Sequence, residues 1–549
     1  MKKINSRLWK TMVGLALMLM VFTISISNTQ ATEQNLNGAS GIDDNKALQL
    51  SLSYLEDHSS DWGIQNPVEE FQLQSVFRDQ LGMLHVRLNQ EYKGVPVFGK
   101  QLIVHLNSDG SLRSITGDYK AGITVSTKPK LTRQEAKDKA IKKFPGPVTE
   151  APVPELMLYP KDDGTVVLVH QVKIHDDETP RSIVAFVDAD NGDIIFYYDD
   201  LQTLSPSVGT DKGQNAVKGS RPTPTPTPTP IPKIGTGKSL YSGQVQIPTS
   251  YDGAKYSLID LIRVNMQTNN MNQKSVGGNV FTDSDNTWGD YTTADSASAG
   301  VDAHFGAEMT FDYYLNVHGR NGINNDGKGT LSRVHYSRNY NNAFWSDSCK
   351  CMTYGDGDGK ILSPLVALDV AGHEMTHGVT SATAGLIYNR ESGGLNEAMS
   401  DIFGTAVEFY AAAHGAAKTP NYWIGEDVWT PGIAGDALRY MDNPRRDGVS
   451  IDSYSNYYNG LDVHYSSGIA NNAFYLLSVG GTHRLGGTTV IGIGIDKSEK
   501  IFYRALTAYM IPSESFSQAR ADTISAATDL YEDGQEVQSV KDAWSAVGV

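Results

Sequence analysis

A run of alternating proline and threonine near the middle of the 549-residue chain constrains its fold more than any other feature. The run reads RPTPTPTPTPIP and extends from Arg221 to Pro232. Proline lacks an amide proton and fixes its own backbone angle, so this run favours an extended, solvated chain over helix or sheet. Together with the polar stretch before it, the run predicts a linker over 205–240. The linker divides the chain into two parts.

The N-terminus has the pattern of a secretory signal peptide. Several basic residues precede an apolar run from Met12 to Ile26, and Thr29-Gln-Ala31 offers small residues for cleavage. A membrane anchor is the alternative, but the run is short for a spanning helix. We therefore expect residues 1–31 to be removed and the mature protein to be secreted, extracellular and free of the membrane.

Charge and cysteine content exclude some classes of protein. The formal net charge is -16, which argues against nucleic acid as a partner. Two cysteines, Cys349 and Cys351, are too few for a disulfide framework. With one residue between them they could form a local disulfide or remain free thiols, and the sequence leaves both possibilities open.

Before the linker, the hydrophobic pattern predicts two small α+β units. Neither contains a cluster of histidine, cysteine or paired carboxylates, so alone they would be interpreted as binding or chaperone modules. The expected helices cover 44–56 and 132–144, and the expected strands cover 85–88, 95–105, 112–119, 165–174, 182–187 and 194–198.

After the linker, a strand-rich region is followed by a helical one. Short alternating strands and turn residues extend from Tyr241 to about Tyr354, with one helix over 303–314. Helical patterns then cover 365–380, 397–413, 467–478, 495–509, 517–531 and 535–547. A strand-rich lobe followed by a helical lobe implies a cleft between the two.

One expected helix contains His373-Glu-Met-Thr-His377, an HExxH pattern. Residues four apart in a helix lie on the same face, so both imidazoles can bind one zinc ion. Glu374 lies beside them and is free to act as a base. The short pattern can also occur by chance in an ordinary amphipathic helix.

A second motif, Asn396-Glu-Ala-Met-Ser-Asp401, reduces that chance. Its Glu397 can be the third zinc ligand, which leaves one coordination position open for water. Asp401, one turn further along, can accept the ring proton of a zinc-bound histidine and fix its tautomer.

These parts predict hydrolysis by a zinc-bound water. Zinc lowers the pKa of its water to about 7 and polarises a carbonyl, and Glu374 takes the proton and passes it to the leaving amine. Candidate donors to the oxyanion are His464 and Tyr388, and Asp462, two residues before His464, could orient or charge its ring.

The part of the chain after the linker, 241–549, resembles the thermolysin and bacillolysin family of zinc endopeptidases along nearly its whole length. The matching stretches include Tyr340-Asn-Asn-Ala-Phe-Trp345, Gly394 to Asp401 and Ile424-Gly-Glu-Asp427. The resemblance implies an α+β fold with a β-rich N-terminal lobe, a helical C-terminal lobe and a zinc cleft between them. It also implies protein and peptide substrates and a monomeric mature enzyme.

The resemblance assigns further roles. Asn342 and the Ala343 carbonyl would hold the substrate backbone, Arg439 would bind a substrate carbonyl, and Tyr388 and His464 would stabilise the oxyanion. Cleavage is expected on the amino side of bulky hydrophobic residues, because the pocket for the residue after the scissile bond would be lined by Leu362, Leu365, Val370, Ile424 and Leu438. The aspartate that partners the active-site histidine in thermolysin is replaced here by Asn459, and Asp462 matches a pseudolysin-like alternative.

The first part of the chain also has relatives. The stretch from His85 to Gly99 resembles the fungalysin/thermolysin propeptide module, and 132–199 resembles a PepSY domain. We therefore expect a self-processing zymogen whose propeptide is chaperone and inhibitor, cut between 205 and 240. The expected domains are a signal peptide (1–31), two propeptide modules (32–120 and 121–204), a linker with the processing site (205–240) and two catalytic lobes (241–384, which includes the zinc helix, and 385–549).

Calcium is the second expected metal. By helical spacing, Asp369 lies on the zinc-helix face and Glu408 on the same face as Asp401, and with Glu426 they could converge and need a hard cation. The thermolysin cluster of this kind holds two calcium ions, but here Asn421 stands for an aspartate and Trp423 for a glutamate. We expect one tight calcium and a weak or absent second. Further calcium sites are expected at Asp283 and Asp285, and at Trp429, Thr430, Ile433 and Asp436.

The sequence allows two other interpretations. A secreted binding or inhibitory protein with an inactive protease fold would be expected to lack a zinc ligand, Glu374 or His464, and none is missing. Alternatively, the 44–199 part could be the functional module, which activity of the separated halves would decide.

Overall fold

The computed structural model describes residues 41–176, 179–206 and 229–549. The chain divides into two compact units, 1–39 and 40–549, and all that follows concerns the second. The expected signal peptide and most of the expected linker lie outside the described residues. No helix among the described residues is long and apolar enough to cross a membrane.

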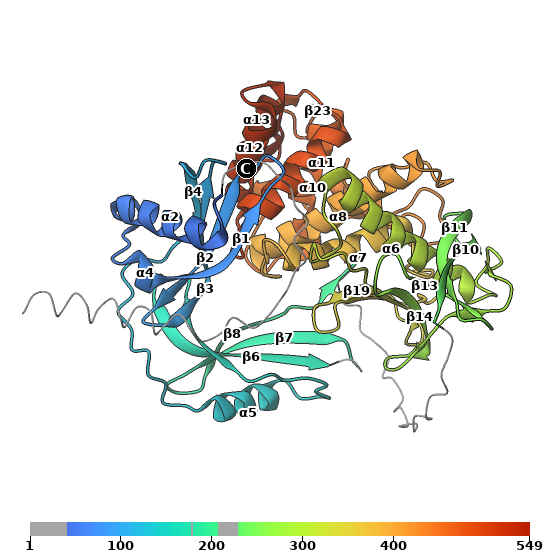
Figure 1. The fold of residues 1–549 in the computed structure, drawn as a ribbon, viewed down its shortest axis with the longest axis horizontal. Helices are drawn as coiled ribbons and strands as arrows, with labels where there is room; N and C mark the ends of the chain where they lie inside the picture. The colour runs from blue at the N-terminus through green and yellow to red at the C-terminus, as the bar shows by residue number, and fades with distance from the viewer. Residues whose placement is uncertain (1–40, 177–178, 207–228) are drawn as a thin grey trace, which may run out of the picture. The chain divides into compact units, whose positions relative to one another are not determined.

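An eight-stranded sheet forms most of the region before the linker (Figure 1). Its strands follow the order β1-β2-β3-β5-β6-β7-β8, with β4 paired to β3. The two expected units meet in it at one parallel contact between β3 and β5, at Val97 and Leu158. The strands are β1 (Phe71–Arg78), β2 (Leu84–Tyr92), β3 (Val95–Leu106), β4 (Leu112–Asp118), β5 (Glu155–Pro160), β6 (Val166–Asp176), β7 (Arg181–Asp188) and β8 (Ile194–Asp199).

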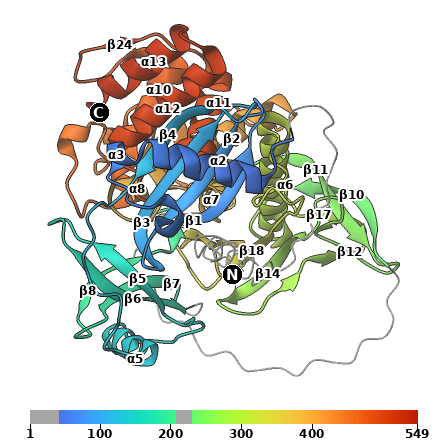
Figure 2. The same ribbon diagram turned by 60° about the vertical axis from the view of Figure 1, so that its left-hand side comes forward.

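Each half of this sheet carries its own helix (Figure 2). Helix α2 (Asp44–Asp57) begins at Asp43, whose side chain accepts a bond from the Lys46 amide, and it packs on β1 and β2. Short helices α3 (Ser59–Trp62) and α4 (Pro67–Glu70) follow. Helix α5 (Arg133–Lys143) begins with a capping box formed by Thr132 and Glu135 and packs on β6 and β7. The expected helices and six expected strands are confirmed, whereas β1 and β5 were not predicted.

Two further sheets build the strand-rich lobe. The first has the order β16-β12-β11-β10-β17 and the second the order β13-β14-β18-β20-β19-β9, with β15 paired to β14. The strands are β10 (Ile231–Lys238), β11 (Gln244–Tyr251), β12 (Tyr256–Ser257), β13 (Ile259–Asp260), β14 (Met266–Lys274), β15 (Asn279–Val280), β16 (Thr282–Asp283), β17 (Thr287–Trp288), β18 (Leu331–Tyr336), β19 (Ala343–Ser346) and β20 (Cys351–Tyr354).

Two strands fall where the sequence suggested otherwise. Strand β10 lies inside the range expected as linker and pairs along its full length with β11. Strand β9 (Gln202–Thr203) comes from the end of the region before the linker but pairs antiparallel with β19, at the edge of the second sheet of the strand-rich lobe. Residues on both sides of the linker therefore share one sheet.

Helices make up the rest of the fold (Figure 1). Helices α7 and α8 pack closely because glycines meet: a Cβ on Gly372 would lie 2.9 Å from the Gly404 Cα. The helices are α6 (Ala297–His318), α7 (Leu368–Ser381), α8 (Arg390–Ala413), α9 (Val463–Ser466), α10 (Gly468–Val479), α11 (Ile495–Arg504), α12 (Phe516–Tyr531) and α13 (Gln535–Ala546). Small elements β21 (Trp423–Ile424), β22 (Arg439–Tyr440), β23 (Gly481–Thr482) and β24 (Thr489–Val490), with 3-10 turns at Pro444–Asp447 and Tyr454–Asn456, complete it.

Three helix predictions needed correction. Helix α8 begins seven residues before the predicted start at Glu397, because the Gly393-Gly394 pair serves close packing and does not break the helix. A Cβ on Gly393 would lie 2.5 Å from Val463, and one on Gly394 would lie 2.4 Å from Ser466. Helix α6 is longer than predicted at both ends, and the helix predicted over 495–509 ends at Arg504, after which Ala505–Tyr509 form a π-helical turn.

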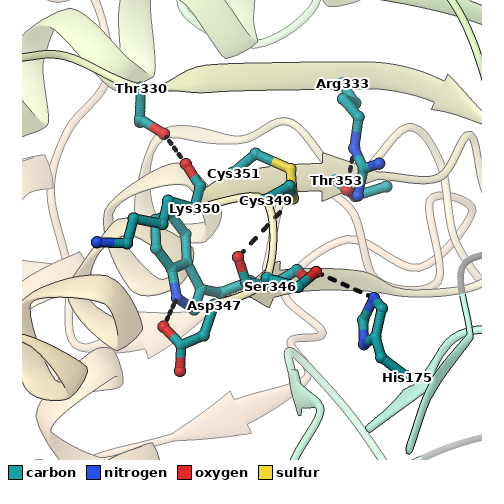
Figure 3. The surroundings of a disulfide bond; sticks show 11 residues. His175, Thr330, Arg333, Ser346, Asp347, Cys349, Lys350, Cys351 and Thr353 are labelled. Atoms are coloured by element: carbon teal, nitrogen blue, oxygen red, sulfur yellow. Dashed lines mark hydrogen bonds between the residues drawn. A yellow bond between two sulfur atoms is a disulfide. The ribbon is translucent and has the colours of Figure 1, made fainter. Parts of the chain in front are cut away.

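The two cysteines form a disulfide, which decides between the two possibilities left open by the sequence (Figure 3). The bond lies in the hairpin that joins β19 to β20, where Ser346 pairs with Cys351. Cys351 is buried and Cys349 is exposed. At the same turn, Ser348 forms a hydrogen bond of 3.1 Å with His175 of the region before the linker.

Candidate active site

Helices α7 and α8 bring two histidines and one glutamate together. The Nε2 atoms of His373 and His377 lie 3.1 Å apart, and the Glu397 carboxylate lies 3.6 Å from the first and 3.4 Å from the second. All three side chains are fully buried. Among the described residues, this is the one group of three or more histidine, cysteine or acidic side chains whose ligand atoms all lie within 4.8 Å of one another.

The partners of the two imidazoles direct their free nitrogens toward one point. His373 Nδ1 lies 2.9 Å from the Asp401 carboxylate, and His377 Nδ1 lies 2.8 Å from Oδ1 of the Asn396 side chain. Both acceptors require a proton on Nδ1, so both Nε2 lone pairs face each other and Glu397. Ligand atoms 2.0–2.1 Å from a tetrahedral zinc ion stand about 3.3 Å apart, so the three side chains fit this metal.

Glu374 lies next to this group, and its carboxylate is not held by other side chains. Both of its carboxylate oxygens are buried, without a hydrogen bond of normal geometry to any described residue. Burial raises the pKa of Glu374 well above its usual value, and the charge of Glu397 raises it further. A buried carboxyl with a raised pKa and free lone pairs suits the exchange of a proton with a nearby water.

His464 and Tyr388 point into the same site from other elements. The Tyr388 hydroxyl bonds to Glu397 and lies 3.2 Å from His464 Nε2. His464 Nδ1 lies 2.6 Å from Asp462, which also caps the short helix α9. Asp462 therefore occupies the partner position that the sequence suggested for it.

The surroundings of His464 shift its pKa in two opposite directions. Burial lowers its pKa, but the nearby carboxylates of Glu397 and Asp462 outweigh burial, so the net pKa is raised. A charged imidazolium has a proton on each nitrogen, and it can therefore donate to Asp462 and to a substrate oxygen at once.

Asp401 links the predicted zinc ligand His373 to the predicted substrate-binding residue Arg439. Besides His373, it accepts bonds from Arg439 Nε at 2.8 Å and from Asn471 Nδ2 at 2.8 Å. Burial raises its pKa, but the Arg439 charge and the His373 contact outweigh burial and hold the pKa below its usual range. Asp401 is therefore a fixed anion that orients both a predicted zinc ligand and a predicted substrate-binding arginine.

The predicted substrate-binding residues are buried or partly buried. Asn342 and Ala343 lie at the start of β19, and both are buried. The five predicted pocket residues belong to, or pack against, the main apolar cluster of the catalytic part: Leu362, Leu365, Val370, Ile424 and Leu438.

The cleft also holds a segment of the chain itself. Residues Gln202–Thr203 pair with β19, and Leu204 and Ser205 continue past the site. Thr203 bonds to His464, predicted to stabilise the oxyanion, and Leu204 and Ser205 bond to Arg439 and Asn342, predicted to bind substrate. Sequence patterns did not predict this occupancy, because nothing in the residues 202–205 marks them as belonging to a strand of the other part.

The predicted calcium ligands beside the site form a second group, here named the acidic cluster: Asp369, Glu408 and Glu426. Lys418, which sequence reasoning missed, reaches into it, with Nζ 2.5 Å from Glu408, 2.7 Å from Glu426 and 2.6 Å from Asp427. The side-chain amide of Asn421 donates to Glu426 at 2.7 Å. Mutual repulsion of the carboxylates is therefore relieved by an ammonium from the same chain.

The other predicted calcium residues lie in turns. The Asp283 carboxylate accepts bonds from the backbone amides of Asp285 and Asn286. In the loop that contains Trp429 and Ile433, Asp436 accepts bonds from the hydroxyls of Thr430 and Tyr440, both at 2.7 Å. These carboxylates are satisfied by local donors.

Comparison with known proteins identifies the family. Residues 234–381 match "Thermolysin metallopeptidase, catalytic domain", 384–549 match "Thermolysin metallopeptidase, alpha-helical domain", and 69–119 match "Fungalysin/Thermolysin Propeptide Motif". Thermolysin of Alicyclobacillus acidocaldarius subsp. acidocaldarius is 39% identical over 493 residues, which cover 86% of this chain and 84% of that protein. This chain belongs to the thermolysin family of metallopeptidases.

Other relatives are similar over different shares of their length. The transglutaminase-activating metalloprotease of Streptomyces mobaraensis is 41% identical over 502 residues, 88% of this chain but 61% of that protein. Among solved structures, the precursor of protealysin from Serratia proteamaculans has 30% identity and a TM-score of 0.43, and the match covers 52% of this chain and 88% of that one. As a member of the thermolysin family with a propeptide motif, this chain is a zinc metalloendopeptidase made as a zymogen.

Proposed function

We propose that this thermolysin-family enzyme hydrolyses peptide bonds on the amino side of bulky hydrophobic residues. In this proposal His373, His377 and Glu397 hold the zinc, and Glu374 is the general base. A bound zinc ion would polarise the scissile carbonyl and acidify a water. The observation that carries the proposal is the convergence of two imidazole lone pairs and a carboxylate beside the unpaired Glu374.

The remaining roles belong to residues of this chain. Glu374 would take a proton from the attacking water and deliver it to the leaving nitrogen. His464, charged and oriented by Asp462, and the Tyr388 hydroxyl would donate to the oxygen of the scissile carbonyl as negative charge develops there. Arg439, held by Asp401, would bind the carbonyl of the residue after the scissile bond.

Specificity would come from the apolar pocket. Four of its five residues are buried at 2% exposure or less, and they are aliphatic: Leu362, Leu365, Val370 and Ile424. Because an aliphatic pocket cannot compensate a buried charge, it favours Leu, Ile, Val or Phe after the scissile bond. Mass spectrometry of a digested peptide library tests this. A preference for Lys or Arg at that position would contradict it.

The propeptide is proposed as inhibitor and chaperone. Strand β2 of the propeptide reaches the helical lobe through buried polar contacts. Its Arg87 donates to the carbonyl oxygens of Met510 and Thr507 at 2.8 and 3.0 Å. Its last strand, β9, lies in the cleft. Adding the separated 32–204 segment to mature enzyme should inhibit hydrolysis of a short peptide and restore activity to the denatured catalytic part. A segment that does neither would contradict the proposal.

We propose that calcium is a structural ion and that Lys418 limits its binding in the acidic cluster. The acidic cluster already contains the Lys418 ammonium, so calcium would have to share or displace it. This supports one calcium at most in the cluster, in line with the loss of charge at Asn421 and Trp423. Sites at Asp283/Asp285 and around Asp436 remain proposals. Metal analysis of enzyme dialysed against a calcium-selective chelator, together with thermal inactivation rates, tests the number of ions and their effect.

Secretion and a monomeric mature enzyme complete the proposal. The basic and apolar pattern of the first 31 residues supports export, with removal of the signal peptide. The remaining domain boundaries are proposed as above, except that the strand-rich lobe begins at β10. The N-terminal sequence of the exported precursor and its sedimentation at several concentrations test these points.

A further inference from the structure

Residues 202–205, the segment in the cleft, contact the site as a bound substrate would. These contacts indicate which peptide bond would be cut. We infer that the bond between Thr203 and Leu204 is the first one that the enzyme cuts in its own chain. The inference rests on the proposed roles of the site residues, and it places the cut just before the range 205–240 in which the processing site was expected.

The Thr203 carbonyl lies where the scissile carbonyl must be. Its oxygen accepts a hydrogen bond of 2.7 Å from His464 Nε2 and lies 3.4 Å from the Tyr388 hydroxyl. These are the two donors proposed for the developing oxyanion. The Thr203 hydroxyl and amide also lie near them, at 3.3 Å from His464 and 3.4 Å from Tyr388.

The next residue, Leu204, makes both backbone contacts expected after the scissile bond. The Leu204 amide donates to the Ala343 carbonyl at 3.0 Å, and the Leu204 carbonyl accepts from Arg439 at 2.5 Å. Its side chain is fully buried and belongs to the apolar cluster that contains the proposed pocket residues Leu362 and Val370.

The residue after that completes the register. The Ser205 amide donates to Asn342 Oδ1 at 3.2 Å, and Asn342 Nδ2 donates to the Ser205 carbonyl at 2.8 Å. Together with the antiparallel pairing of β9 on β19, these bonds hold the backbone on both sides of one peptide unit. Leu201, the other apolar residue nearby, lies in a separate cluster with Tyr336 and Phe344, so a shifted register is not favoured.

Cleavage at this bond is an ordinary hydrolysis. The hydroxyl of one water molecule bonds to the Thr203 carbonyl carbon, the bond from that carbon to the Leu204 nitrogen breaks, and the remaining proton passes through Glu374 to that nitrogen. The products are a Thr203 carboxyl group and a Leu204 amino group, which ionise to a carboxylate and an ammonium. Because the bond is already bound in its own cleft, the first cut should be intramolecular and its rate independent of protein concentration.

The test follows maturation of the purified full-length precursor at several dilutions, with intact-mass analysis and N-terminal sequencing of the earliest fragments. Wild-type chain should give a fragment that begins at Leu204, at a rate that does not change with dilution. Leu204→Asp places a charge in the apolar pocket and should slow this cut at least about 100-fold. Leu204→Met nearly conserves the volume and should retain the cut.

Two controls make the outcomes decisive. Ile231→Asp changes an exposed apolar residue inside the originally expected range, so it should leave the Leu204 fragment unchanged. Hydrolysis of a short peptide with leucine after the scissile bond, measured on the matured enzyme, tests the proposed function separately. An active enzyme whose earliest fragment begins elsewhere, or forms faster at higher concentration, overturns this inference alone. Failure of Glu374→Gln to abolish peptide hydrolysis overturns the proposed function itself.

Discussion

Helices α7 and α8 carry the group of His373, His377 and Glu397 and also two members of the acidic cluster, Asp369 and Glu408. The two groups differ in how their charge is balanced. In the group of His373, His377 and Glu397, both imidazoles direct lone pairs inward. The Arg439 guanidinium, which is held by Asp401, lies 3.9 Å from Glu397, and His464 Nε2 lies 3.7 Å from it. In the acidic cluster, by contrast, Lys418 lies within 2.7 Å of Glu408 and Glu426.

This difference indicates which of the two groups depends on a bound ion. Buried charges of one sign are unfavourable unless a counter-charge is present, and in the acidic cluster the chain supplies it. The chain supplies no comparable counter-charge to the histidine group. A metal ion is therefore the partner that its lone pairs and carboxylate require. We therefore expect the catalytic group to depend strictly on zinc and the acidic cluster to depend only weakly on calcium.

The largest effect is expected from Glu374→Gln. Peptide hydrolysis should fall by a factor of about 10³ or more, because the base is lost, while zinc content should stay near one per chain, because Glu374 is not among the three converging side chains. Turnover of a short peptide and metal analysis of the same sample measure both. Near-normal turnover would remove Glu374 from the proposed mechanism.

The next effect concerns the internal cation. Lys418→Met should destabilise the protein by about 3 kcal/mol in the absence of calcium, because it leaves buried carboxylates without their partner. Added calcium should restore part of the loss. Calorimetry in a Glu374→Gln background, which prevents self-digestion, measures this.

A matched control is Lys497→Met, which removes a half-exposed lysine paired with Glu536 and should cost no more than about 1 kcal/mol. If Lys418→Met is as mild as this control, or if calcium has no effect on it, the two groups do not differ as described.

A smaller effect is expected at the edge of the zinc group. Asp401→Asn should weaken zinc binding by about 10- to 100-fold, because the His373 tautomer and ring orientation are no longer held by a carboxylate. Competition with a zinc chelator measures the affinity, and KM for a short peptide reports the separate loss at Arg439. Unchanged zinc affinity would show that Asp401 serves only the arginine. Asp542→Asn, which changes a partly exposed carboxyl of α13 bonded to Gln538, is the control.

The smallest effect tests internal charge pairing away from both groups. Asp79 of the propeptide lies 2.6 Å from Arg504 of the helical lobe and 2.8 Å from His85. Burial raises its pKa, but the bond to His85 and the Arg504 charge outweigh burial and lower the pKa to about 2 from the ordinary 3.8. A carboxyl whose folded pKa is depressed contributes stability that is full above pH 3.8 and is lost as the pH falls through about 2.

Asp79→Asn in the Glu374→Gln precursor should therefore lower thermal stability at pH 5, and the difference from the parent should shrink as the pH approaches 2. Asp61→Asn, an exposed carboxyl in the same propeptide, should show no such trend. A difference that stays constant across this range would mean that the charge on Asp79 contributes nothing.

Much of the catalytic group was predictable because its members are close in sequence. Two residues four apart on one helix share a face whatever surrounds them, so His373 and His377 needed no tertiary information. Glu397 and Asp401 repeat the same logic on the next helix. Asp462 could be predicted for His464 because the two are two residues apart. The start of α8 was missed because Gly393 and Gly394 suggest a break, whereas close packing against α9 requires small residues there.

The sequence by itself determined the kind of chemistry: a helix with two histidines and a glutamate, a second helix with a third ligand, and a linker that separates two parts of the chain. Only the tertiary structure decided which groups balance the buried charges and what lies in the cleft. The Lys418 ammonium, the Arg439–Asp401 pair and the binding of Thr203 and Leu204 in the cleft join residues 8 to 261 positions apart. Contacts at such separations depend on the packing of whole elements, and local spacing contains no record of them.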